Sequence, residues 1–97
     1  METLNYDYPA TGTVATRVHV GVVGSGDLEV LMEPTSGGLA KVVINTSVDG
    51  FGAVWKSVID RFFTRFDGQV NIEINDFGAT PGVVLLRLEQ AVEESKL

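Results

Sequence analysis

Two runs of alternating hydrophobic and polar residues flank a glycine-rich segment in the first third of the chain. The hydrophobic positions are Val18, Val20 and Val22 in the first run and Leu28, Val30 and Met32 in the second. A period of two is typical of a strand with one buried face. Gly24-Ser25-Gly26-Asp27 separates the runs, and glycine readily adopts the positive φ that tight turns require. The pattern therefore predicts a β-hairpin with this tetrad at its apex.

The next two elements differ in their periodicity. Residues 41–48 alternate as before and predict a third strand. The spacing of hydrophobic residues then changes to three and four, which predicts an amphipathic helix over about 52–67. We expect Asp49 or Gly50 near the N-cap of this helix and Gly68 at its C′ position.

The last two elements complete a two-layer pattern. Residues 69–76 alternate again and predict a fourth strand, and a second helix begins at Pro81 with Thr80 as its N-cap. We interpret residues 1–12 as an N-terminal arm. One-sided strands and helices bury their hydrophobic faces against each other. We therefore predict one domain, residues 1–97, of the α+β class: a four-stranded, mostly antiparallel sheet with two helices on one face, in the order β-β-β-α-β-α.

The same pattern predicts what each layer carries. Aromatic rings contribute a large stabilisation when buried, and the aromatic residues expected to dominate the core are Trp55, Phe62, Phe63 and Phe66. The outer face of the sheet would meet water or partners. It carries Arg17, His19, Glu29, Glu33, Lys41 and Asn45.

Composition narrows the function. The 97 residues include no cysteine and one histidine and carry a net charge of −6. Disulfides, thiolate zinc sites and a cysteine nucleophile are excluded, and the acidic balance argues against a nucleic-acid partner. No apolar run is long enough for a membrane span, and the N-terminus is not a signal peptide. We expect a cytoplasmic protein with no membrane partner.

Most candidate sites have a simpler structural explanation. His19 has no Ser-Asp pair or second metal ligand nearby, which favours a solvated or hydrogen-bonded surface histidine. Asp76-Phe77-Gly78 spells a kinase tripeptide but lacks the other kinase motifs, so it is interpreted as a turn. The close glycines at 21–26 precede a strand instead of a helix, which argues against a dinucleotide site.

Ser25 is the one side chain with a distinctive setting. It lies between Gly24 and Gly26 at the predicted apex of the hairpin, where a partner's pocket could close over its hydroxyl. It lacks a general base and is therefore a poor nucleophile. The residues alone favour a serine that suits a turn, although the position also fits an acceptor of a covalent group.

A resemblance to a known family extends over nearly the whole chain. Residues 20–30 (VGVVGSGDLEV), the early segment and the NDFGA stretch at 75–79 resemble the acyl carrier (delta) subunit of malonate decarboxylase. They are similar, more loosely, to the acyl carrier (gamma) subunit of citrate lyase. The motif departs from ordinary phosphopantetheine carriers, which are helical bundles with an Asp-Ser-Leu motif.

The malonate decarboxylase resemblance implies a carrier without catalytic residues. Ser25, in the turn formed with Gly24, Gly26 and Asp27, would carry 2′-(5″-phosphoribosyl)-3′-dephospho-coenzyme A through a phosphodiester. Acetyl and malonyl groups would travel on its thiol between acyltransferase and decarboxylase subunits, after a prosthetic-group transferase had attached the arm. Asp27 and Glu29 could assist docking on basic partner surfaces.

Two readings with a different function remain open alongside the two carrier types. The chain could be an unmodified interaction module that docks through its sheet face, with Ser25 a turn residue only. A small enzyme that uses His19 or the carboxylates ranks last, because no catalytic constellation supports it.

Overall fold

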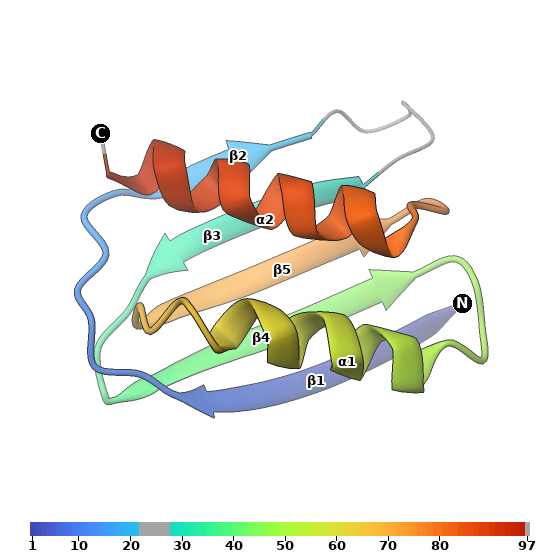
Figure 1. Ribbon diagram of the computed structural model, residues 1–97, viewed down its shortest axis with the longest axis horizontal. Coiled ribbons are helices and arrows are strands. Elements are labelled where there is room, and N and C mark those ends of the chain that lie inside the picture. Colours follow the sequence, from blue (N-terminus) through green and yellow to red (C-terminus); the bar gives the residue numbers. More distant parts are fainter. Residues whose placement is uncertain (22–27, 97) are drawn as a thin grey trace.

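Two helices cover one face of a five-stranded sheet in the computed structural model, which describes residues 1–21 and 28–96 (Figure 1). The strands are β1 (Glu2–Pro9), β2 (Val18–Val20), β3 (Leu28–Pro34), β4 (Leu39–Thr46) and β5 (Val70–Asp76). The helices are α1 (Gly52–Phe63) and α2 (Pro81–Ser95). The α+β class and the placement of both helices on one face are confirmed.

The strand order is β1-β4-β5-β3-β2. Only β4 and β5 pair in parallel, and α1 connects them, while the other three pairings are antiparallel. The mostly antiparallel sheet is therefore confirmed, including the antiparallel pairing of β2 with β3. The single parallel pair explains why α1 must cross the sheet between β4 and β5.

The predicted number of strands is wrong, because residues 2–9 form a strand instead of an arm. β1 pairs antiparallel with the whole of β4, from Glu2↔Thr46 to Pro9↔Leu39. Its partly buried residues Leu4, Tyr6 and Tyr8 pack against the core, while the residues between them are exposed. Two of the three inward side chains are tyrosines, so the alternation is less hydrophobic than in the other strands.

Tyr8 ties β1 to α1. Its hydroxyl donates to Asp60 Oδ1 at 2.6 Å, and its ring stacks on Phe63 with the centroids 4.2 Å apart. Burial, followed by this hydrogen bond, raises the pKa of the Tyr8 phenol. The Tyr8 hydroxyl and the Lys56 ammonium, which lies 3.1 Å from both carboxylate oxygens, lower the pKa of Asp60.

α1 begins at Gly52 as predicted but is shorter than predicted at its C-terminal end. Asp49 and Gly50 lie near its N-cap as predicted, but the N-cap residue itself is Phe51, which makes no side-chain capping bond. The helix ends at Phe63, where the Thr64 hydroxyl donates to the Arg61 carbonyl at 2.7 Å. The following residues turn away to reach β5, and Gly68 is therefore not at the C′ position.

The core is mainly aliphatic, which corrects the expectation of an aromatic one. Of the four aromatic residues expected there, Trp55 and Phe62 are buried, whereas Phe63 and Phe66 are only partly buried at its margin. The largest side chains with almost no exposure are aliphatic: Leu28, Met32, Ile44, Ile59, Ile72, Ile74 and Leu88. They come from the inward positions predicted for the strands and from the two helices.

The start of α2 is as predicted. Thr80 is the N-cap, its hydroxyl accepts from the Val83 N–H at 3.4 Å, and Pro81 occupies the first turn. This cap fixes where α2 leaves the loop that follows β5.

Candidate functional site

The predicted attachment turn lies outside the described residues, but both of its flanks are described. Ser25, Gly24, Gly26 and Asp27 all fall within residues 22–27. Before them, β2 ends with the pair Val20↔Val30, and Gly21 has a φ of 92°. A Cβ at Gly21 would collide with the carbonyl oxygen of Leu28. Only glycine therefore fits at this position, which follows β2.

Several elements meet at the end of the sheet where this segment leaves it. β2, β4 and β5 end there, and α1 and α2 both begin there (Figure 1). We call it the cavity end, because a cavity of about 410 Å³ lies between the first turns of the two helices and the ends of β4 and β5. Its lining comprises Thr46, Val48, Phe51, Val54, Trp55, Val58, Asp76, Gly78, Ala79, Pro81 and Val84.

A buried carboxylate supports one wall of the cavity. Asp76 Oδ2 accepts from the Thr46 hydroxyl at 2.8 Å, and its Oδ1 accepts from the N–H groups of Gly78 and Ala79 at 3.2 and 2.9 Å. Asp76 is 5% exposed and Thr46 1%. Asp76-Phe77-Gly78 is therefore a structural turn between strand and helix, as predicted, and Gly78 takes a φ of 110° in it.

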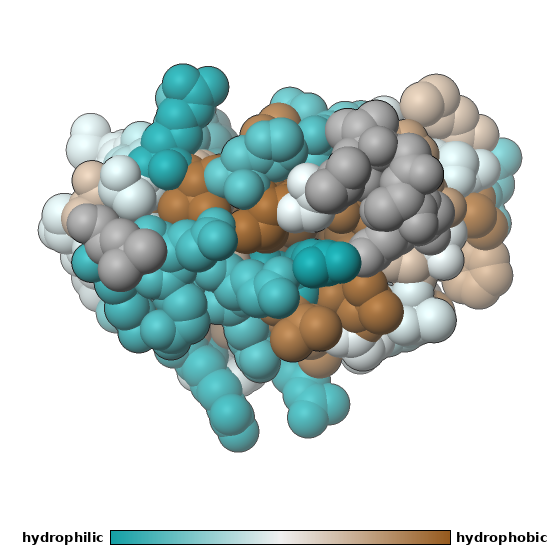
Figure 2. Space-filling view, turned by 90° about the horizontal axis from the view of Figure 1, so that it is seen from above, coloured by the Kyte–Doolittle hydropathy of each residue, from teal (hydrophilic) through white to brown (hydrophobic). Residues whose placement is uncertain are grey.

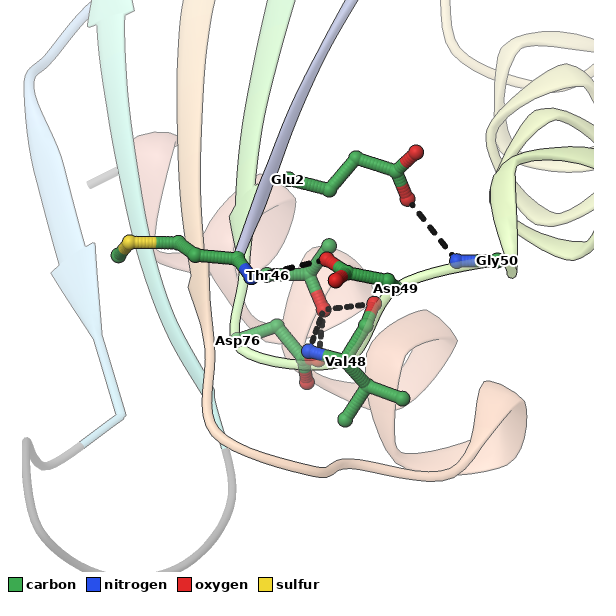
Figure 3. Close-up of polar contacts among 7 residues, drawn as sticks. Glu2, Thr46, Val48, Asp49, Gly50 and Asp76 are labelled. Carbon is green, nitrogen blue, oxygen red and sulfur yellow. Dashed lines mark hydrogen bonds and ion pairs between the residues drawn. The ribbon is translucent and has the colours of Figure 1, made fainter.

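The connection from β4 to α1 forms a second wall of the cavity. It is held by contacts with Thr46 at the end of β4 and with the start of β1 (Figure 3). The Val48 N–H donates to Thr46 Oγ1 at 3.1 Å. From the neighbouring strand β1, the Glu2 carboxylate accepts from the Gly50 N–H at 3.3 Å, and the terminal ammonium lies 2.9 Å from Asp49 Oδ1. These contacts hold the polar backbone of the connection and leave its hydrophobic side chains toward the cavity.

Five polar side chains form a hydrogen-bonded row across the uncovered face of the sheet, one from each strand. We call Thr3, Asn45, Asn75, Glu29 and His19 the polar row. The distances between successive members are 3.1 Å, 3.0 Å, 2.8 Å and 2.8 Å. The strand registers place Thr3, Asn45, Asn75 and Glu29 beside one another, whereas His19 is paired with Leu31 and reaches Glu29 diagonally. The row therefore depends on tertiary structure.

The polar row decides the role of two predicted surface residues. His19 Nε2 bonds Glu29 Oε2, and no catalytic triad includes it among the described residues. Glu29 is only 9% exposed, which corrects its assignment to a solvated outer face and does not suit a docking role. Arg17, His19, Glu33 and Lys41 are exposed as predicted, and Asn45 is half-buried.

Sequence reasoning missed both the cavity and the polar row. The cavity combines residues from four segments, which local periodicity does not bring together. The row needed the strand order, which periodicity does not supply. Within the described parts of the chain, no group of three His, Cys, Asp or Glu residues could hold a metal ion. Nor is any described helix long and apolar enough to cross a membrane.

Comparison with known proteins is consistent along the chain. Residues 15–95 match the family described as malonate decarboxylase delta subunit (MdcD). The malonate decarboxylase acyl carrier protein of Pseudomonas putida is 54% identical over 95 residues, covering 97% of this chain and 96% of that protein. The protein of the same name from Azotobacter vinelandii is 50% identical with the same coverage.

A solved structure supports the same relationship. The crystal structure of a Pseudomonas malonate decarboxylase hetero-tetramer in complex with malonate contains a chain that is 48% identical to this one. The TM-score is 0.90, and the match covers 97% of this chain and 98% of the other.

Proposed function

Because the chain belongs to the malonate decarboxylase delta subunit family, we propose that it is the acyl carrier subunit of a malonate decarboxylase and carries its acyl group on an arm attached to Ser25. The observation that supports this most strongly is the similarity over 97% of the chain to proteins named as this carrier. Ser25 is the serine of the Gly-Ser-Gly-Asp sequence within the segment that carries the resemblance.

The proposed arm is 2′-(5″-phosphoribosyl)-3′-dephospho-coenzyme A. When bound, it would supply a terminal thiol on which acetyl and malonyl groups form thioesters. The described residues fit the acyl end of such an arm, since the cavity beside the attachment segment is mainly apolar. They offer no cationic pocket for its phosphates there, because no Lys or Arg lines the cavity among the described residues.

The chain's own contribution is then delivery. A tether makes each encounter with a partner site intramolecular, at an effective concentration of about millimolar for a short flexible link. The only histidine is held by Glu29 in the polar row. No residue of the carrier is therefore assigned as acid or base, and these would come from other subunits.

The proposed partners follow from the same family. The similar crystal structure is of a hetero-tetramer, and we expect acyltransferase and decarboxylase subunits to receive the carrier in turn. A prosthetic-group transferase would attach the arm during maturation. The single domain of residues 1–97 and the cytoplasmic location belong to the same proposal.

The direct test is the intact mass of the chain after expression with the maturation enzymes. We expect an adduct of the mass of the proposed arm on the wild type and none on Ser25→Ala. Ser36→Ala is the matched control, because Ser36 is another serine next to glycine in the sequence and is exposed in the turn between β3 and β4. It should carry the full adduct.

The same measurement separates the alternatives. An unmodified wild-type chain would support an interaction module and contradict the carrier. A citrate-lyase-type carrier would also acquire the adduct, but it would assemble with citrate lyase subunits instead of those of malonate decarboxylase.

A further inference from the structure

The cavity between the helix starts has the dimensions and lining of a small-ligand site. Its volume of about 410 Å³ lies within the range of about 300–1,000 Å³ typical of such sites. Three of its hydrophobic lining residues are unusually exposed: Val48 by 40%, Phe51 by 50% and Val54 by 44%. In Figure 2, which keeps the horizontal axis of Figure 1, brown and tan atoms cover much of the right-hand end, which is the cavity end.

The side chains that line the cavity include no cation that would favour an anionic occupant. Asp76 is the only ionisable residue among the lining residues that the structure describes. Its two oxygens already accept three hydrogen bonds from Thr46, Gly78 and Ala79. An anion that entered would lose its hydration, meet a carboxylate and find no cation among these residues. A small apolar group would instead bury surface against Val54, Trp55 and Val84.

The first described residue after the attachment segment lies beside a residue that lines this cavity. Leu28, three residues after Ser25, is the register partner of Asp76 in the sheet. Three residues span about 11 Å at most. The attachment point of an arm on Ser25 is therefore within about 11 Å of Leu28, next to the cavity wall. An arm that must also reach active sites on other subunits is long enough to return to this wall.

We propose that the cavity holds the acetyl-thioester end of the arm and rejects the malonyl-thioester end. This rests on the proposed function. The acetyl end is neutral and small, which suits the apolar lining, whereas the malonyl end carries a carboxylate. Replacing acetate by malonate would therefore release the arm from the carrier's own surface. Decarboxylation would restore the neutral end, which returns to the cavity.

The test compares thioester exposure in carriers loaded with an acetyl or a malonyl group. Hydroxylamine attacks the thioester carbonyl, the C–S bond breaks and the thiol is released, so the rate reports access to that carbonyl. Val54→Trp is the blocking variant, because Val54 lies at the cavity mouth and its exposure leaves room for the larger ring. Leu86→Trp is the matched control: Leu86 is 51% exposed on α2 and does not line the cavity.

Burying about two methyl or methylene groups should protect the acetyl thioester about tenfold in the wild type. Val54→Trp removes this protection and should increase the cleavage rate of the acetyl thioester about tenfold. The cleavage rate of the malonyl thioester should be the same in Val54→Trp and the wild type. Leu86→Trp should change neither the acetyl nor the malonyl cleavage rate. Equal acetyl rates in Val54→Trp and wild type would overturn the proposal. An equal increase for acetyl and malonyl would also overturn it, because the cavity would then not distinguish the charge.

A second measurement does not depend on cleavage. In methyl NMR spectra, the signals of Val54 and Val84 should shift when the free thiol is acetylated and return toward their thiol-form positions when the group is malonyl. Absence of any shift on acetylation would contradict docking. Failure of the proposed function would look different, because the chain would then carry no adduct and could not be loaded at all.

Discussion

The two ends of the sheet are built in opposite ways. At the end opposite the cavity, which we call the closed end, segments far apart in the chain are joined by backbone hydrogen bonds. The Thr11 and Gly12 N–H groups donate to the Asp67 carbonyl at 3.1 and 2.9 Å, and the Gln69 N–H donates to the Gly12 carbonyl at 3.0 Å. The Gln69 side chain adds bonds to the backbone of Gly12 and Gly38 at 3.1 and 3.0 Å.

Among the described residues, the cavity end has fewer such bonds and more exposed hydrophobic side chains. Its polar interior depends mainly on one carboxylate, Asp76, while Phe51 and Val54 remain half-exposed. The difference indicates that the closed end fixes the fold, whereas the cavity end leaves apolar surface available for a ligand.

The largest expected effect is at Asp76. Asp76→Ala would leave the N–H groups of Gly78 and Ala79 without their acceptor, and the buried Thr46 hydroxyl with only the Val48 carbonyl at 3.3 Å. We expect the free energy of unfolding to fall by about 3 kcal/mol, measured by urea denaturation. Asp76→Asn keeps one acceptor oxygen and should lose less. An unchanged midpoint for Asp76→Ala would show that the cavity end does not depend on this carboxylate.

Gln69→Ala tests the closed end. The variant loses the side-chain bonds to the backbone of residues 11, 12 and 38, and we expect a decrease of about 1–2 kcal/mol in the free energy of unfolding. Gln90→Ala is the control, since Gln90 is exposed on α2 and should change stability by less than about 0.5 kcal/mol. Equal effects of the two variants would contradict the closed-end description.

Tyr8→Phe is expected to change how the stability of the protein depends on pH. The pKa of Asp60 is lowered from 3.8 in the folded chain, so its contribution to stability is present above pH 3.8 and is lost as the pH falls through the folded pKa. The pKa of Tyr8 is raised from 10.0, so stability is also lost above pH 10.0. Thermal melts should show that Tyr8→Phe weakens both dependences; identical pH profiles would exclude this contact as their cause.

The smallest effect is expected for Val54→Ser. Val54 is 44% exposed, so the free energy of unfolding should change by less than about 0.5 kcal/mol. Denaturation curves that coincide with the wild type would agree with a surface kept for binding. A loss as large as that of Asp76→Ala would mean that Val54 belongs to the core.

Periodicity predicted most of the secondary structure and the layer arrangement. The inward positions of β3, β4 and β5 and the Thr80 cap of α2 follow directly from local sequence. β1 was missed because Tyr6 and Tyr8 weaken its hydrophobic signal, although they alternate with Leu4 at a period of two. The end of α1 was missed because the backbone after Phe63 turns toward the closed end, which local spacing does not encode.

Only the part of the candidate site that lies within one short segment of the sequence was predictable. Ser25 was predicted from the glycines around it and from a family resemblance, and it stays a prediction because it lies outside the described residues. The cavity combines the ends of two strands with the starts of two helices, and the polar row combines five strands. Both features depend on the strand order and on the parallel β4–β5 pair, neither of which is encoded in a single segment.

Two serines in glycine-containing segments provide the most direct test of the central claim. The flanks of the segment containing Ser25 lie at the cavity end, while Ser36 lies at the closed end. The measurement is CO₂ release from malonate by the reconstituted complex after maturation. We predict none above background with Ser25→Ala and the wild-type rate with Ser36→Ala. Release at the wild-type rate with Ser25→Ala would contradict the carrier function assigned to this chain.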